Sequence, residues 1–261
     1  MVPYIPSVTF AVGAAEYDRF MGRYSVPLAR VFAEFTGVGS GVPVLDVGCG
    51  AGALTGELIA RLGADAVWAI DPSESFVAAV RDRYPGVRVR QAAAEQLPFE
   101  DRLFGAALAQ LVVHYLTDPV AGLREMTRVT QHGGVVAACV WDFAGGRSPL
   151  TLFWKAAREL DPDAGSQSGV TGAAQGQLAV LLRTAGLQDV DETQLTIEVE
   201  HSTFEEWWEP FTFGIGRAGS YVTQLAAAKR DRLRDCCREM LPPAPFVVSA
   251  SAWAALGRVS S

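Results

Sequence analysis

The chain has 261 residues, of which 49% are hydrophobic and 20% are charged. A chain of this length and composition forms a large globular core, which excludes extensive disorder. The net charge of −7 argues against binding to the phosphate backbone of nucleic acids, because that contact needs a basic surface.

Short apolar runs alternate with longer amphipathic segments from Val42 onward. They predict strands at 42–48, 66–71, 87–91, 104–113 and 135–142, with helices at 53–62, 73–83 and 119–130 between them. Asp118 is placed to cap the last of these helices, and Pro119 suits its first position. Parallel neighbours need helical crossovers of this length. We therefore expect an α/β fold: a doubly wound, Rossmann-like, mostly parallel seven-stranded sheet with helices on both faces and a small helical cap.

The last third of the chain follows a different pattern. A helical stretch, a Gly/Ser-rich segment, a helix ending near Gly186 and a strand follow one another, and Thr203 with Glu206 then forms a capping box. A long helix is predicted for 219–241, before a last apolar run. We expect one domain over 1–261, in which residues 1–40 form a helical segment over a cofactor. Residues 142–177 and 203–241 are expected to be insertions that cover the acceptor.

A glycine loop follows the first strand. The segment VLDVGCGAG places Gly48, Gly50 and Gly52 between a strand and a helix. Glycine there permits positive φ and a close approach of backbone to ligand, and the helix N-terminus favours a negative group. The same residues, with Ala53, also satisfy the dinucleotide template G-x-G-x-x-G/A, so the loop alone leaves both cofactor classes open.

Two carboxylates follow strands near this loop. Asp46 stands two residues before Gly48 and would repel a pyrophosphate, whereas it would favour an ammonium group directly or by orienting the loop. The alternative is a structural Asp46 that caps the loop. Asp71 ends the second strand and can accept bonds from both ribose hydroxyls, in either cofactor class, unless it caps the next helix instead.

With these motifs the sequence resembles the class I S-adenosylmethionine-dependent methyltransferases, in the branch typified by ubiquinone/menaquinone-biosynthesis methyltransferases (methyltransferase type 11). The match covers about residues 17–141. It rests on VLDVGCGAG, AIDPSESF, AAAEQLPFEDRLFGAALAQLVVHYLTDP and LREMTRVTQHGGVV, in the expected order and spacing.

The resemblance implies an S-adenosyl-L-methionine site. The residues it implies for cofactor binding are Tyr17, Arg23, Asp46, Gly48, Cys49, Gly50, Asp71, Pro72, Phe76, Ala94, Glu95 and Gln110. Among these, the loop and Gln110 would border the methionine end, and Asp71 the ribose. Arg23 would pair with the carboxylate, unless it is a surface or helix-packing arginine. A backbone N–H after the third strand would meet the adenine edge, where Ala93 replaces the family's usual Asp.

Methyl transfer is an in-line displacement from a sulfonium, so the protein mainly aligns the reactants. His114 is the candidate general base where the acceptor must lose a proton, and a packing role is its alternative. Tyr115, Trp141 and Asp142 are candidates for the acceptor pocket. The aromatic segment at 207–213 suits an apolar or planar acceptor, or else buries its rings in its own core.

The sequence leaves two other functions open: a nicotinamide-dependent oxidoreductase and a non-catalytic S-adenosylmethionine-binding protein. We expect a small-molecule acceptor, no nucleic-acid or membrane partner, and a monomer or homodimer. The four cysteines have neither zinc-site spacing nor disulfide density, and the three histidines lie far apart, so no metal is expected. Because there is no membrane-length apolar run and no signal-peptide start, we expect a soluble, cytoplasmic protein.

Overall fold

The computed structural model describes residues 17–165 and 169–260. Its sheet has seven strands in the order β3-β2-β1-β4-β5-β7-β6. The strands are β1 (Val44–Val47), β2 (Val67–Asp71), β3 (Arg88–Gln91), β4 (Phe104–Gln110), β5 (Thr130–Trp141), β6 (Gln188–His201) and β7 (Phe246–Arg258). Strands β1 to β5 are parallel, whereas β7 runs antiparallel to both β5 and β6. The predicted mostly parallel, doubly wound sheet is confirmed.

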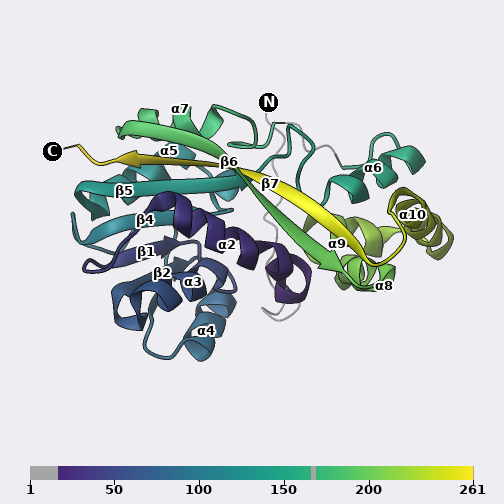
Figure 1. Ribbon diagram of the computed structural model, residues 1–261, viewed down its shortest axis with the longest axis horizontal. Coiled ribbons are helices and arrows are strands. Elements are labelled where there is room, and N and C mark those ends of the chain that lie inside the picture. Colours follow the sequence, from purple (N-terminus) through teal and green to yellow (C-terminus); the bar gives the residue numbers. More distant parts are fainter. Residues whose placement is uncertain (1–16, 166–168, 261) are drawn as a thin grey trace.

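Helices cover both faces of the sheet (Figure 1). They are α2 (Arg23–Thr36), α3 (Ala53–Leu62) and α4 (Glu74–Arg83) on one face, and α5 (Pro119–Val129) and α7 (Gln177–Thr184) on the other. Phe32 and Leu58 are fully buried on the first face and Leu123 on the second. Burying each such side chain contributes about 1.5–3 kcal/mol, so these helices dock through their apolar stripes.

A helical cap lies at one end of the sheet, where β6 and β7 extend beyond the other strands (Figure 1). Its elements are α6 (Thr151–Leu160), α8 (Phe204–Trp208), the 3₁₀ helix η4 (Glu209–Phe213), α9 (Gly216–Gln224) and α10 (Ala227–Met240). These elements fall within the predicted insertions. The cap has its own core of buried aromatic and aliphatic side chains, separate from those of the sheet.

The single helix predicted for 219–241 is wrong, because Leu225 and Ala226 have extended backbone and separate α9 from α10. The break lets α10 pack against α6 and bury Leu233 and Cys237. Tertiary packing therefore overrides the local helix preference. The predicted cap at Asp118 is confirmed, since its Oδ1 accepts a bond of 2.9 Å from the Ala121 N–H.

The N-terminal part of the described chain is helical. A π-helical turn, η1 (Asp18–Gly22), leads directly into α2. Both belong to the segment predicted to cover the cofactor, of which residues 1–16 lie outside the described residues. Short 3₁₀ turns, η2 (Ala64–Ala66) and η3 (Val113–Tyr115), complete the fold. In the described ranges, no helix combines the length and the apolar character needed to cross a bilayer.

Candidate functional site

A cavity of about 350 Å³ opens beside the glycine loop, at the carboxyl ends of β1, β2 and β4. Except for Asp46 and Arg23, every residue predicted to bind the cofactor lines it. Those residues are Tyr17, Gly48, Cys49, Gly50, Asp71, Pro72, Phe76, Ala94, Glu95 and Gln110. Ligands bind at this edge of doubly wound sheets. The residues that the sequence pattern singled out therefore form one contiguous surface.

The glycine loop is tied to the neighbouring strand by its own backbone. The N–H groups of Gly48 and Cys49 both donate to the carbonyl of Ile70, at 2.8 and 2.9 Å. Gly48 and Gly50 have φ of +73° and +51°, which glycine adopts without strain. A Cβ at Gly50 would meet nothing within 4 Å, so this residue borders open space.

Asp71 stands at the cavity edge with both carboxylate oxygens held by backbone donors. Oδ2 accepts from the Gly50 N–H and Oδ1 from the Ser73 N–H, each at 2.9 Å. Burial raises the pKa of Asp71, and these two bonds act in the opposite direction. The carboxylate is therefore oriented before any ligand arrives, with acceptor lone pairs to spare.

Asp46 departs from its expected direct contact, because it does not line the cavity. It is almost fully buried and accepts a bond of 2.6 Å from the Thr55 hydroxyl in α3. Burial raises the pKa of Asp46 to about 7, while the bonds from Thr55 lower it. Asp46 thus fixes the start of α3 against β1, and charge at this residue is no longer an argument for an ammonium ligand in direct contact.

Arg23 also departs from its expectation. Its helix neighbours Gly22 and Ser25 line the cavity, but Arg23 points elsewhere on α2. Its Nη1 donates to His201 Nδ1 at 2.9 Å and lies 3.4 Å from a carboxylate oxygen of Glu206. The helix period of 3.6 residues explains the difference, since residues 22 and 25 share a face that residue 23 does not. The packing alternative describes Arg23.

The Arg23 contact fixes the state of His201. Because a guanidinium only donates, Nδ1 of His201 accepts, and its Nε2–H donates to the Tyr24 hydroxyl at 3.0 Å. His201 is fully buried, and burial together with the charge of Arg23 lowers its pKa to about 4. This neutral histidine joins α2 to the end of β6.

The His201 network predicts a pH-dependent stability. Between pH 4 and 6.5 the unfolded chain binds a proton at His201, whereas the folded chain leaves this histidine neutral. The contribution of neutral His201 to the free energy of unfolding is therefore complete above pH 6.5 and is lost as pH falls toward 4. We expect the stability advantage of the native protein over His201→Gln to shrink by about 1 kcal/mol per pH unit across this window. Urea unfolding of both proteins measures it. A constant difference would contradict the assignment.

Gln110 joins β4 to α2 at the cavity wall. Its Nε2 donates to the backbone carbonyl of Ser25 at 2.9 Å. Its Oε1 is buried and has no hydrogen-bond partner among the described residues. A buried acceptor without a donor is costly, so this oxygen is suited to a donor that a ligand supplies.

Sequence reasoning missed a connection between η1 and the glycine loop. Arg83 of α4 pairs with Asp18 and also donates to the Ala51 carbonyl at 3.1 Å. Asp18 and Ala51 both line the cavity. Arg83 gave no local signal, because it appears in sequence only as the basic last turn of a helix.

Leu111 is a second residue of the site that sequence reasoning missed. It lines the cavity directly after β4 with φ of +62°, and its N–H donates to the Cys139 carbonyl at 2.9 Å. A left-handed conformation is unfavourable for leucine and persists only where surrounding structure imposes it. No residue type in the sequence announces it.

The residues proposed for catalysis and acceptor binding separate in the structure. Tyr115 lines the cavity, but His114 does not. The His114 ring packs against those of Tyr115 and Phe143, at centroid distances of 4.0 and 5.9 Å. Trp141 and Asp142 are buried away from the cavity. Asp142 instead pairs with Arg147 at 2.5 Å. It therefore fixes the loop after β5.

The aromatic segment belongs to the cap core. Trp207, Trp208 and Phe211 are buried, and the ring of Phe211 stacks on that of Phe153 at 4.5 Å. None of the three lines the cavity. These rings are therefore buried in the core of the cap, which is the alternative that the sequence left open. Among the described residues, no group of three or more His, Cys, Asp or Glu side chains is placed to hold a metal ion.

Comparisons with known proteins agree with this geometry. Residues 45–138 match a family model described as a methyltransferase domain. The ubiquinone/menaquinone biosynthesis C-methyltransferase UbiE of Bordetella parapertussis is 31% identical over 209 residues, which cover 71% of this chain and 80% of that protein. Its namesake in Idiomarina loihiensis is 34% identical over 134 residues, covering 47% of this chain and 53% of the relative. This chain thus spans about half of one relative and four fifths of the other.

The fold has solved counterparts. The crystal structure of the YcgJ protein from Bacillus subtilis superimposes with a TM-score of 0.57 at 17% identity. The superposition covers 91% of this chain and 99% of that one. At this identity the likeness concerns the fold.

Proposed function

This chain belongs to the class I S-adenosylmethionine-dependent methyltransferases, in the ubiquinone/menaquinone-methyltransferase-like branch, and from this premise we propose that it methylates a small-molecule acceptor. The family's cofactor, S-adenosylmethionine, supplies a methyl group already activated on a sulfonium. Because the chain belongs to this family, a methyltransferase is favoured over the nicotinamide-dependent oxidoreductase that the glycine template left open.

The cavity residues suit the parts of this cofactor. We assign the ribose hydroxyls to Asp71, whose oriented carboxylate is the observation that carries the proposal. The N–H groups of Gly48 to Gly50 are already bonded within the protein. The carboxylate of the cofactor is therefore assigned to the first turn of α3, where Ala53 and Leu54 line the cavity. The unpartnered Oε1 of Gln110 is available to its ammonium.

The chain's own contribution is alignment. Pro72, Phe76, Ala93 and Ala94 border the end assigned to adenine, and Tyr17 packs edge-on against Phe76 at 5.5 Å. A held cofactor presents its methyl group to an acceptor in one direction, and such orientation accounts for roughly 7–11 kcal/mol in favourable reactions. Tyr115, Leu116 and Thr117 complete the wall from which the acceptor is approached.

The acceptor is proposed to be a small molecule. A quinol-type ring is the first acceptor to test, because the relatives are ubiquinone/menaquinone biosynthesis C-methyltransferases. The acidic chain supports the absence of a nucleic-acid partner, and the four free cysteines suit a reducing cytoplasm. A monomer or homodimer is proposed for the assembly.

Transfer of label from methyl-labelled cofactor to phenols, amines and quinols, followed by identification of the product, tests the proposal. Calorimetry with S-adenosylhomocysteine and NAD accompanies it. The expected result is binding of the former only, and label in one acceptor class. Binding without transfer to any class would favour the non-catalytic alternative, and binding of NAD alone would overturn the assignment.

His114 is the proposed general base for an acceptor that must lose a proton and that extends past the cavity wall at Tyr115, since the His114 ring does not itself line the cavity. Burial lowers its pKa to about 4, so the ring is already neutral at neutral pH and its basic form is lost only as pH falls toward 4. With an acceptor that does not titrate in this range, we expect kcat/KM to stay constant from about pH 5.5 to 8. A rise centred near 6.5 would identify a base other than His114.

A further inference from the structure

One wall of the part of the cavity assigned to adenine has no regular secondary structure. It belongs to the connection between β3 and β4, residues 92–103. Ala93, Ala94 and Glu95 of this connection line the cavity. Ala93 and Ala94 carry no polar side chain, and the Glu95 carboxylate already accepts a bond of 3.0 Å from the Thr117 N–H. The main chain is therefore placed to supply the directional contacts here. The position of this backbone therefore matters more than the identity of its side chains.

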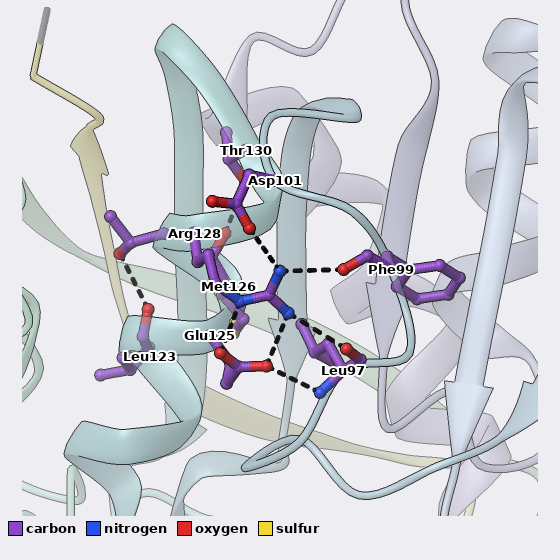
Figure 2. Close-up of polar contacts among 9 residues, drawn as sticks. Leu97, Phe99, Asp101, Leu123, Glu125, Met126, Arg128 and Thr130 are labelled. Atoms are coloured by element: carbon purple, nitrogen blue, oxygen red, sulfur yellow. Dashed lines mark hydrogen bonds and ion pairs between the residues drawn. The ribbon is translucent and has the colours of Figure 1, made fainter.

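Arg128 of α5 binds this connection at several points (Figure 2). Its Nη2 donates to the Leu97 carbonyl at 3.1 Å and its Nη1 to the Phe99 carbonyl at 2.8 Å. Nη1 also donates to the Asp101 carboxylate at 2.7 Å. In the part of the chain that the structure describes, Arg128 is the one hydrogen-bond donor to those two carbonyls.

Glu125, one turn earlier on α5, completes the attachment. It accepts from Nε and Nη2 of Arg128 at 2.7 and 2.8 Å, a two-pronged contact that only a guanidinium makes. Its Oε2 also accepts from the Leu97 N–H at 2.9 Å. These bonds to Arg128 lower the pKa of Glu125. The arginine and glutamate thus hold Leu97 by both its carbonyl and its N–H.

The attachment reaches the cavity within one turn of chain. The Gln96 N–H donates to the Ala93 carbonyl at 3.2 Å, which joins the residues next to Leu97 to the cavity wall. Ala94 lies against α5 at Gly122, where an added Cβ would sit 3.6 Å from the Ala94 Cβ. A shift of Leu97 therefore moves Ala93 and Ala94 relative to the glycine loop.

We infer that Arg128 is a positioning residue for the adenine end of the cofactor, and this inference rests on the proposed function. Arg128 does not line the cavity and acts through the backbone at Leu97. It sets the main-chain groups of Ala93 and Ala94 at the adenine edge. Discrimination of adenine from related bases should therefore depend on Arg128.

The test compares Arg128→Ala and Arg128→Lys with the native protein and with Arg61→Ala. Arg61 is a matched control: it pairs with Glu57 at 2.6 Å, and the side-chain exposures are 29% and 25% against 32% and 23% for Arg128 and Glu125. It also donates to a backbone carbonyl, that of Arg30, at 3.0 Å. Arg61 lies in the last turn of α3, at the end away from the glycine loop.

Calorimetry measures two ligands: S-adenosylhomocysteine, and S-inosylhomocysteine, in which a carbonyl oxygen replaces the adenine amino group. Circular dichroism sets a temperature at which all variants are folded. We expect Arg128→Ala to weaken binding of the adenosyl ligand about tenfold and to narrow its preference over the inosyl ligand. Arg128→Lys should behave like the alanine variant, because an ammonium cannot form the fork. Arg61→Ala should bind both ligands like the native protein.

Three results would overturn the inference: native affinity in Arg128→Ala, an equal loss for both ligands, or the same loss in Arg61→Ala. Each of them leaves the proposed function intact, provided that the native protein binds S-adenosylhomocysteine. Failure of the native protein to bind either ligand would instead refute the proposed function itself.

Discussion

Replacing Asp71 with alanine is expected to weaken binding of S-adenosylhomocysteine at least tenfold. The carboxylate is fixed by the N–H groups of Gly50 and Ser73, so it meets the ribose without reorganising. A hydrogen bond to a charged group contributes roughly 1.5–3 kcal/mol, and a tenfold change corresponds to about 1.4 kcal/mol. Titration calorimetry measures the loss.

A 2′,3′-dideoxyribose analogue separates ribose binding by Asp71 from its contact with the glycine loop through the Gly50 N–H. In the native protein, removing both ribose hydroxyls from the ligand should cost a similar factor, whereas in Asp71→Ala it should cost little. Ser73→Ala is the control, since the backbone N–H that orients Asp71 remains. Unchanged affinity in Asp71→Ala would refute the ribose assignment.

Gly48→Ala is expected to abolish measurable cofactor binding and to destabilise the fold by about 2–4 kcal/mol. Gly48 has φ of +73°, and an added Cβ would lie 2.5 Å from one methyl carbon of Val112. The glycine loop and Val112 would both have to move, and both border the cavity. Denaturant unfolding and calorimetry measure the two effects.

Two companion variants separate strain from collision. Gly37 has φ of +62° and open space where a Cβ would go, so Gly37→Ala should cost only about 1–2 kcal/mol and leave binding intact. Adding Val112→Ala to Gly48→Ala should restore part of the stability, because the collision is relieved. If Gly48→Ala proved no worse than Gly37→Ala, the close contact with Val112 would not matter.

The fold was predictable because its signals are local and repeat along the chain. Apolar runs separated by amphipathic segments define the parallel strands, and Asp118 with Pro119 marks the start of α5 as predicted. The break at Leu225 and Ala226 was not predictable, since neither residue opposes a helix. It exists because α10 gains contacts with α6 that are distant in sequence.

The site was predictable where function leaves a motif. Gly48, Gly50 and Asp71 stand at fixed distances from a strand end, and the structure brings these three residues to one cavity. Asp46 and Arg23 were assigned by charge, and charge does not reveal direction. The Thr55 hydroxyl binds Asp46 to the start of α3, and Arg23 binds His201 at the end of β6. Arg83 and Leu111 depend on contacts and backbone strain that no local pattern encodes.

The β6–β7 pair limits how far the cap can move relative to the sheet. Its ladder is continuous from Asp191 opposite Leu256 to His201 opposite Phe246, so the same two strands belong to the sheet and reach the cap. Swinging the cap away as a rigid body would bend this paired ribbon and break its hydrogen bonds. Movement of the cap relative to the sheet should therefore be limited to small displacements of loops and side chains.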